Sequence, residues 1–373
     1  MQPAYLVVII ALLTLSLPLT AEVGEFDIRP VVPLSPERLT ALRQLVAADP
    51  EAQALAAEAI VAAEPFLDDE PQPVRVIHYE GLVNTDSKRI ATVAKLREMD
   101  HVAALVRRWQ VQGDAVSAAA LLRFVDAWSA TYEPTGNDVN ENKLLPLLVA
   151  WHALHGQADA SVQEQVTAWI DRLAPPHCQA VKKRKRLNNR YTKHVRLVAL
   201  FGLINQRDDW LALARRGVER FVAGSLRPDG TSLDLELRDT LTYHCSSLKP
   251  PIELAIILGD EALYSWESAD GASLKKSVGY VIPYATGAKT RKEWVNSRSR
   301  LDQERAEAGL EKYRKGRLFD PQDASGLMAL ASCFDPDLRP LAQRLSGAEG
   351  RYIGWRSLIH AAVQAATESG KRD

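Results

Sequence analysis

The sequence has almost no net charge, few cysteines and few segments with the alternating pattern of a β-strand. Its 46 Lys and Arg residues balance 47 Asp and Glu residues, and the net charge of −1 gives no bulk reason to expect a nucleic-acid or membrane partner. Cys178, Cys245 and Cys333 are odd in number, so at least one thiol stays unpaired even if export permits a disulfide. Because Cys-x-x-Cys and His-rich spacings are absent, we predict no structural zinc.

The beginning of the chain differs from everything after it. Residues 5–19 are almost entirely apolar, no charge precedes Glu22, and the small Ala21 closes the stretch. This stretch is too short for a stable membrane span and suits a secretory leader, although it lacks a basic start and has Leu19 at the −3 position. We expect a cleaved leader over 1–21 and a periplasmic or secreted protein; an uncleaved anchor is the alternative.

Helical patterns dominate the sequence after the leader. Ser35 and Pro36 are typical of a helix cap and a first helical position. Apolar residues recur at helical spacing over 87–111, 114–130, 141–156, 161–173, 190–204, 207–223, 250–258 and 351–367. Only 232–237 and 279–282 alternate like short strands, and no long Gly/Ser linker divides the chain. We therefore expect one all-α domain over 22–373, an (α/α) toroid or incomplete barrel of helical hairpins with few short strands.

Two polar segments lie in the first half of the chain. Tyr79 and Glu80 belong to the first, which precedes the helix predicted over 87–111. The second, 132–143, is rich in turn-forming residues and runs into a predicted helix, with Asn140 as the expected cap. Capping and turn formation account for most of this segment, whereas Asn140 and Glu141 remain candidates for the wall of a pocket.

A third polar segment begins with five basic residues, 182–186, which are typical of a solvated surface or a non-specific anion patch. If a helix begins near Asn189, its buried stripe consists of Tyr191, Val195, Val198 and Gly202. Arg190, Lys193 and His194 then share another face. Two neighbouring cations should lower the pKa of His194 and keep it neutral at pH 7. An ordinary exposed polar face fits the same pattern.

The fourth segment places an Arg, a Tyr and a His within seven residues. Arg238, Tyr243 and His244 follow a Pro-Asp-Gly turn at 228–230. A phenol and an imidazole can transfer protons, and a guanidinium can hold a carboxylate. Alternatively, Arg238 forms an ion pair with Asp234 or Asp239 and Tyr243 is a core aromatic residue.

The order of these segments resembles the alginate-lyase family of polysaccharide lyases. The shared pattern is a pair of Asn residues, an Asp-Gly turn, an Arg and a Tyr-His pair, here Asn188-Asn189, Asp229-Gly230, Arg238 and Tyr243-His244. The resemblance covers most of residues 75–310. It implies a helical toroid enzyme that cleaves 1,4-linked uronans by β-elimination. One position departs from the family, because Arg190 stands directly after the two Asn residues where the family has His.

The resemblance also implies roles for the site residues. Asn189 and Arg238 would neutralise the substrate carboxylate, and Tyr243 would transfer protons with a pKa lowered by Arg238. We expect His194, rather than Arg190, to take the place of the family His. The expected substrate contacts, among which His244 has a supporting rather than a catalytic role, are Asn188, Arg190, Lys193, His244, Tyr79, Glu80, Asn140 and Glu141. No metal or organic cofactor is required, and the basic run 182–186 would steer an anionic polysaccharide.

Two other classes of function fit parts of the sequence. A glycoside hydrolase needs two carboxylates beside the scissile bond, for which Asp229, Asp234 and Glu236 are available. A non-catalytic protein that binds polyanionic glycans would explain the basic run, but gives no reason for Arg238, Tyr243 and His244 to gather. The sequence leaves open which uronan is the substrate.

Overall fold

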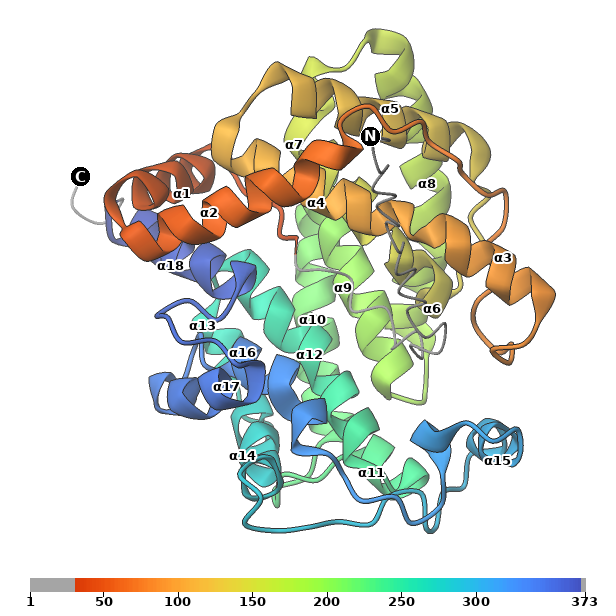
Figure 1. Ribbon diagram of the computed structural model, residues 1–373. Coiled ribbons are helices and arrows are strands. Elements are labelled where there is room, and N and C mark those ends of the chain that lie inside the picture. The colour runs from red at the N-terminus through yellow and green to blue at the C-terminus, as the bar shows by residue number, and fades with distance from the viewer. Residues whose placement is uncertain (1–30, 370–373) are drawn as a thin grey trace, which may run out of the picture.

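The computed structural model describes residues 31–369, and the regular secondary structure of this part of the chain is almost entirely helical (Figure 1). Its α-helices are α1 (Pro36–Ala48), α2 (Pro50–Ala63), α3 (Ser87–Leu96), α4 (Glu98–Gln112), α5 (Ala115–Thr131), α6 (Asp138–Glu141), α7 (Leu145–Leu154), α8 (Ala160–Lys183), α9 (Asn189–Ile204), α10 (Asp208–Ser225), α11 (Leu233–Arg238), α12 (Leu241–Leu258), α13 (Glu261–Ser265), α14 (Leu274–Ala285), α15 (Arg300–Glu307), α16 (Ser325–Ala331), α17 (Arg339–Ser346) and α18 (Trp355–Ser369). The predicted leader, 1–21, lies outside the described residues.

The two predicted strands are wrong, because both segments form helices. Residues 233–237 lie in α11, which Ser232 caps, and residues 279–282 lie in α14. Each helix follows an Asp-Gly turn and begins at a Ser whose hydroxyl accepts a backbone N–H, Ser232 from Leu235 at 3.3 Å and Ser273 from Lys276 at 3.2 Å. Extended pairing among the described residues is limited to isolated bridges, two of which close these turns. The Ser cap therefore starts a helix where the residue alternation indicated a strand.

Two helices extend well beyond their predicted ranges. The pattern ended one helix at 173, but α8 continues through Pro175 and Pro176 to Lys183. The predicted helix 250–258 is the second half of α12, which begins at Leu241 and contains Pro250 and Pro251. Proline removes a helical hydrogen bond, but packing on neighbouring helices keeps both helices continuous. Tyr243 therefore lies in the first turn of α12 rather than in a loop.

Helix α9 lies between the two larger hydrophobic cores. Leu197, Leu200 and Phe201 pack into the core formed with α4, α5, α7 and α8. Tyr191 and Val195 pack into the core formed with α10, α12, α14 and α16. Both predictions for this helix, its start near Asn189 and its buried stripe, are confirmed. A third core joins α1 and α2 to α18, so segments from both ends of the described chain lie side by side (Figure 1).

A buried carboxylate connects α9, α12 and α18. Glu253 of α12 accepts from Arg196 of α9 at 2.5 Å and from Arg356 of α18 at 2.8 Å. Burial tends to raise the pKa of Glu253, but the charges and hydrogen bonds of the two Arg residues outweigh it and lower the pKa. Arg196 also donates to Asn142 at 2.7 Å. The network therefore joins the three helices α9, α12 and α18 to one another.

The state of the three cysteines and the character of the helices bear on the expectations about disulfides and membrane spans. Cys178, Cys245 and Cys333 are all free thiols. Within residues 31–369, none of the helices has the length and apolar character needed to cross a bilayer.

Glu253→Ala should lower the free energy of unfolding by about 3–5 kcal/mol, because Arg196 and Arg356 would lose a shared buried partner. Urea unfolding followed by circular dichroism measures this change. Glu304→Ala is the control, since Glu304 forms an exposed pair with Arg300, and should change the free energy by less than about 1 kcal/mol. A similar small effect for both variants would contradict the proposed importance of the Glu253 network.

Candidate active site

A cleft of about 460 Å³ opens where α9 and α12 meet the C-terminal helices. Its walls carry four lysines, and its two acidic side chains, Glu253 and Asp323, are already paired with arginines. The cleft therefore has a net positive charge that suits an anionic polymer. Of the predicted substrate contacts, Tyr79 and Lys193 line it. The lysines are Lys143, Lys193, Lys249 and Lys312.

A chain of buried polar groups lies behind the first turns of α9. The Nδ1 atoms of His194 and His177 are 2.7 Å apart, and Nε2 of His177 is 2.5 Å from Oε2 of Glu141. On its outer side, Nε2 of His194 lies 3.3 Å from Nη1 of Arg184. All three members of the chain, His194, His177 and Glu141, are buried.

These contacts determine which ring nitrogen of His194 carries the proton. Arg184 can only donate, so Nε2 of His194 must accept and Nδ1 must hold the hydrogen. Nδ1 of His194 then donates to Nδ1 of His177, whose Nε2–H donates to Glu141. Burial, together with the charges of Arg184 and Arg190, lowers the pKa of His194 to about 4. The predicted neutral state at pH 7 thus agrees with the structure, but burial is its main cause.

Glu141 and Asn140 support the site from within and do not form a pocket wall. Oε1 of Glu141 accepts from the backbone N–H groups of Thr135 and Gly136 at 2.5 and 2.9 Å. The carboxamide of Asn140 donates to the carbonyl of Ile77 at 2.8 Å and accepts from the N–H of Glu80 at 3.0 Å. Both side chains are buried with their polar atoms occupied, so neither predicted substrate contact is available. Asn140 is also not the helix cap, because Asn137 caps α6.

Arg190, which stands at the departure from the family pattern, is held by two carboxylates. Its guanidinium donates to Asp138 at 2.7 Å and to Glu80 at 3.1 Å. Oδ1 of Asp138 also lies 3.6 Å from Nε2 of His194. Glu80 and Arg190 are half-buried, and their ion pair joins the segment around residue 80 to the start of α9. Arg190, Glu80 and Asp138 therefore hold the segment around residue 80 and the start of α6 against the start of α9.

The start of α9 presents two carboxamides beside a buried acid. The Oδ1 atoms of Asn188 and Asn189 are buried and have no hydrogen-bond partner among residues 31–369. The backbone N–H of Asn189 donates to Asp234 at 2.7 Å. Burial raises the pKa of Asp234 to about 7, despite the opposing effects of this N–H and of Arg238 and Lys193. Asp234 thus connects the Asn pair to the segment that carries Arg238 and Tyr243.

Tyr243 lies within a group of arginines and aromatic rings. The guanidinium carbon of Arg238 lies 3.4 Å from the centre of the Tyr243 ring, and Nη1 of Arg305 lies 3.4 Å from its hydroxyl. Arg305 also donates to Tyr313 at 3.0 Å. Arg238 is paired with the buried Asp302 through an Nε–Oδ2 contact of 2.8 Å, rather than with Asp234 or Asp239. Two cations therefore face the phenol.

His244 is buried and does not contact the cleft. Its Nδ1 lies 2.7 Å from the hydroxyl of Ser232, and its Nε2 lies 3.1 Å from the carbonyl of Ser277. Burial lowers the pKa of His244 to about 4. The predicted substrate contact at His244 is therefore wrong, because neither ring nitrogen is available; its role is to hold α11 and α14 against α12.

Several residues of the site are absent from the sequence prediction. His177 lies on the part of α8 beyond its proline pair, where no helix was predicted. Asp138 lies in the turn-rich segment and was not separated from ordinary capping residues. Asp302 and Arg305 lie on α15, a short helix that has only one buried residue and hence no apolar stripe to reveal it. Only the three-dimensional structure shows that α15 lies near Tyr243.

Comparison with known proteins gives the family. Residues 44–294, more than half of the 373 in the chain, match the family model described as alginate lyase. The chain belongs to the alginate lyase family. It is therefore a polysaccharide lyase, as the motif order indicated. No curated protein matches the sequence of this lyase.

Solved structures support the fold of the lyase. An alginate lyase from Bacteroides ovatus superposes with a TM-score of 0.61 at 14% identity, covering 87% of this chain and 97% of that one. Alginate lyase A1-III from Sphingomonas species A1 gives 0.56 at 16% identity, covering 78% and 94%. A His-to-Ala variant of A1-III complexed with a tetrasaccharide gives 0.59 at 16% identity, covering 82% and 89%. The expected all-α toroid is confirmed.

Asp234→Asn should change how the stability of the lyase depends on pH. A folded-state pKa of about 7, against about 3.9 when unfolded, means that the folded protein holds the extra proton between these values. The wild type therefore loses stability as pH rises through 7, whereas the variant keeps its acceptor for Asn189 and does not titrate. From pH 5 to pH 8 we expect the variant to gain about 1–3 kcal/mol relative to wild type in urea unfolding.

Asp337→Asn, a change at an exposed carboxylate, is the matched control and should leave the pH profile of the free energy of unfolding unchanged. Parallel profiles for wild type and Asp234→Asn would contradict the raised pKa of Asp234.

His194 should be neutral and protonated on Nδ1 at pH 7 and at pH 5.5. Long-range ¹H–¹⁵N correlation spectra of the histidine rings report both properties. In Glu141→Gln the amide can donate as well as accept, so it no longer fixes the orientation of protons along the chain, and the His194 signals should shift toward mixed tautomers. The signals of the exposed His78 should be unchanged. A charged or Nε2-protonated His194 in the wild type would refute this hydrogen-bond order.

Proposed function

We propose that this lyase cleaves a 1,4-linked uronan by β-elimination, with Tyr243 as the proton-transfer residue. The observation that carries the proposal is the placement of the Tyr243 phenol between the guanidinium groups of Arg238 and Arg305. Its neighbours on α12, Thr242 and Ser246, line the cationic cleft. A phenol so placed lies beside the path expected for an anionic polysaccharide.

The reaction requires removal of the C5 proton, which lies α to the C6 carboxylate. The intermediate places further negative charge next to that carboxylate, so donors and cations must offset it. We propose Asn189 for this role, because its buried carboxamide lies in the first turn of α9, near Lys193 and the Asn188 side chain. The lysines of the cleft supply positive charge for neighbouring uronate units.

Tyr243 would act first as a base and then as an acid. Burial tends to lower the pKa of Arg238, but its interactions with Tyr243 and Asp302 outweigh burial and raise that pKa. The guanidinium and the phenolate therefore stabilise each other's charged states. The phenolate oxygen takes the C5 proton, the C4–O4 bond breaks as the C4–C5 double bond forms, and the phenol returns the proton to O4. This assignment makes Arg238 a positioning residue that acts through Tyr243.

His194 has a different place in this proposal from the one suggested by the family pattern. Its contacts are with His177, Arg184 and Asp138, all within the buried polar chain. We propose that it positions Arg184 and the start of α9, and that Tyr243 carries out both proton transfers. Support comes from the acceptor state of Nε2, which is directed at Arg184.

The cellular location belongs to the same proposal. A polymeric substrate is met outside the cytoplasm, and the apolar stretch 5–19 is typical of export. We therefore propose a periplasmic or secreted enzyme.

The activity is tested with polymannuronate, polyguluronate and glucuronan as separate substrates. We expect ultraviolet absorbance from an unsaturated uronate end with at least one of them, and the relative rates would identify the preferred uronan. New reducing ends without this absorbance would instead indicate a hydrolase. Binding without a change in polymer length would indicate a glycan-binding protein.

Tyr243→Phe should lower kcat by about 10²–10⁴-fold, because the ring and its packing on Arg238 remain while the proton-carrying oxygen is lost. Initial rates of absorbance increase measure this effect, and KM should change much less. Tyr284→Phe on α14 is the matched control and should retain wild-type activity. Full activity in Tyr243→Phe would remove Tyr243 from the mechanism even if the lyase activity itself is confirmed.

A further inference from the structure

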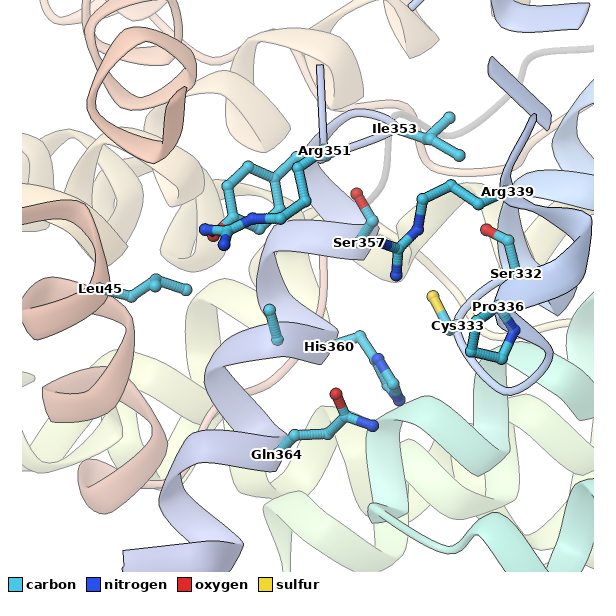
Figure 2. A pocket seen from close by; sticks show the side chains of 12 residues that line it. Leu45, Ser332, Cys333, Pro336, Arg339, Arg351, Ile353, Ser357, His360 and Gln364 are labelled. Carbon is cyan, nitrogen blue, oxygen red and sulfur yellow. The ribbon is translucent and has the colours of Figure 1, made fainter. Parts of the chain in front are cut away.

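A second pocket lies apart from the cleft, between α1, α18 and the segment that connects α16 to α17 (Figure 2). Its volume is about 310 Å³, within the range of sites for small ligands. Helix α18 forms the floor, and none of the residues that line this pocket lines the cationic cleft. A ligand here would therefore not compete directly with a substrate in the cleft.

Three polar side chains that line this pocket have no hydrogen-bond or ion-pair partner among the described residues, although the His360 ring packs edge-on against Phe334. Figure 2 shows His360 and Gln364 pointing from α18 toward the segment that carries Cys333 and Arg339. Within residues 31–369, Arg339, His360 and Gln364 make no hydrogen bond or ion pair. By contrast, the other arginine at the pocket, Arg351, is engaged by Asp49 and Tyr352.

The chemistry of these groups favours a neutral-to-anionic ligand over a metal or a covalent adduct. Burial, with a smaller effect from Arg339, lowers the pKa of His360 to about 4, so the ring offers one donor and one acceptor at neutral pH. Burial also raises the pKa of the Cys333 thiol to about 12, which leaves it without nucleophilic thiolate. Arg339 is therefore the one full charge without a partner among the described residues that line the pocket.

The remaining lining combines apolar residues with the polar side chains of Ser332, Ser357, Arg351 and Tyr352. Leu45 of α1 lies on one side of α18, and Ile353 and Pro336 lie on the other side together with Arg339 (Figure 2). A cationic donor, two neutral hydrogen-bonding groups and apolar walls match a compact ligand with one carboxylate, several hydroxyls and an apolar face. A single sugar acid has this combination of groups.

We propose that this pocket binds a small hydroxylated carboxylate of monosaccharide size, with its carboxylate on Arg339 and its hydroxyls on His360 and Gln364. A uronate monosaccharide and a non-sugar hydroxy acid share this chemistry. The inference does not depend on the proposed lyase mechanism, because it concerns binding at a separate pocket.

The test is ligand-observed NMR titration of the full chain with glucuronate, mannuronate, citrate and glucose. We expect saturable binding of at least one carboxylate and at least about tenfold weaker binding of glucose, which lacks the charge that pairs with Arg339. Stronger binding of the uronates than of citrate would identify a sugar acid, and the reverse would identify a non-sugar hydroxy acid. Equal binding of glucose, or no binding of any carboxylate, would overturn the proposal.

Variants then locate the binding. Arg339→Ala should weaken it about tenfold, and Gln364→Leu should weaken it less. Arg344→Ala is the matched control, since Arg344 is an exposed arginine on the same helix, α17. Lys249→Ala in the cleft should leave this binding unchanged. Loss of binding in Lys249→Ala with no effect of Arg339→Ala would place the ligand in the cleft and refute the pocket. Arg339→Ala should cleave uronans at the wild-type rate. A failure of the pocket proposal can therefore be distinguished from a failure of the proposed lyase activity.

Discussion

The structure depends on one helix that two hydrophobic cores share. Because α9 is apolar on opposite sides, it is packed by α7 and α8 on one side and by α10 and α12 on the other. Gly217 of α10 allows this close approach, since a side-chain carbon there would lie 2.9 Å from Val195 of α9. The helix can neither rotate nor slide without disturbing both cores. Its first turn, which carries Asn189, is therefore held in a fixed position beside the cleft.

Burying charge around this first turn is costly, and the protein offsets the cost by pairing three of the four buried acids with a basic side chain. Asp138 is paired with Arg190, Glu141 with His177, and Asp302 with Arg238. Asp234 differs, because within residues 31–369 its carboxylate accepts from the backbone N–H of Asn189 alone, and burial raises its pKa. Asp234, between the two halves of the site, therefore titrates near neutral pH, while Asp138 and Asp302 hold their arginines and Glu141 holds His177 in fixed orientations.

Much of the helical body was predictable, because apolar spacing reports burial directly. The start of α9 and its stripe followed from Tyr191 and Val195, whereas the assignment of Asn189 and Tyr243 to one site from the motif order stays a prediction. His177 was not predictable, since Pro175 and Pro176 ended the pattern before it while packing continued the helix. Arg305 has no local signature, because its function arises from a contact with Tyr243 across 62 positions of sequence. The two strand predictions were wrong because a Ser that caps a helix and an alternating residue pattern occur in the same short segments. The Ser cap determined the structure.

The proline pair within α12 has an effect on the cleft that extends beyond helix continuity. Pro250 has no N–H, so the carbonyl of Ser246, four residues earlier, lacks the donor that a regular helix would provide. Both residues line the cleft, next to Lys249. The same stretch of the cleft wall therefore carries a main-chain oxygen whose usual helical donor is missing and the side chain of Lys249. The backbone of α12 thus differs from a regular helix at the cleft, a difference that the side chains alone do not reveal.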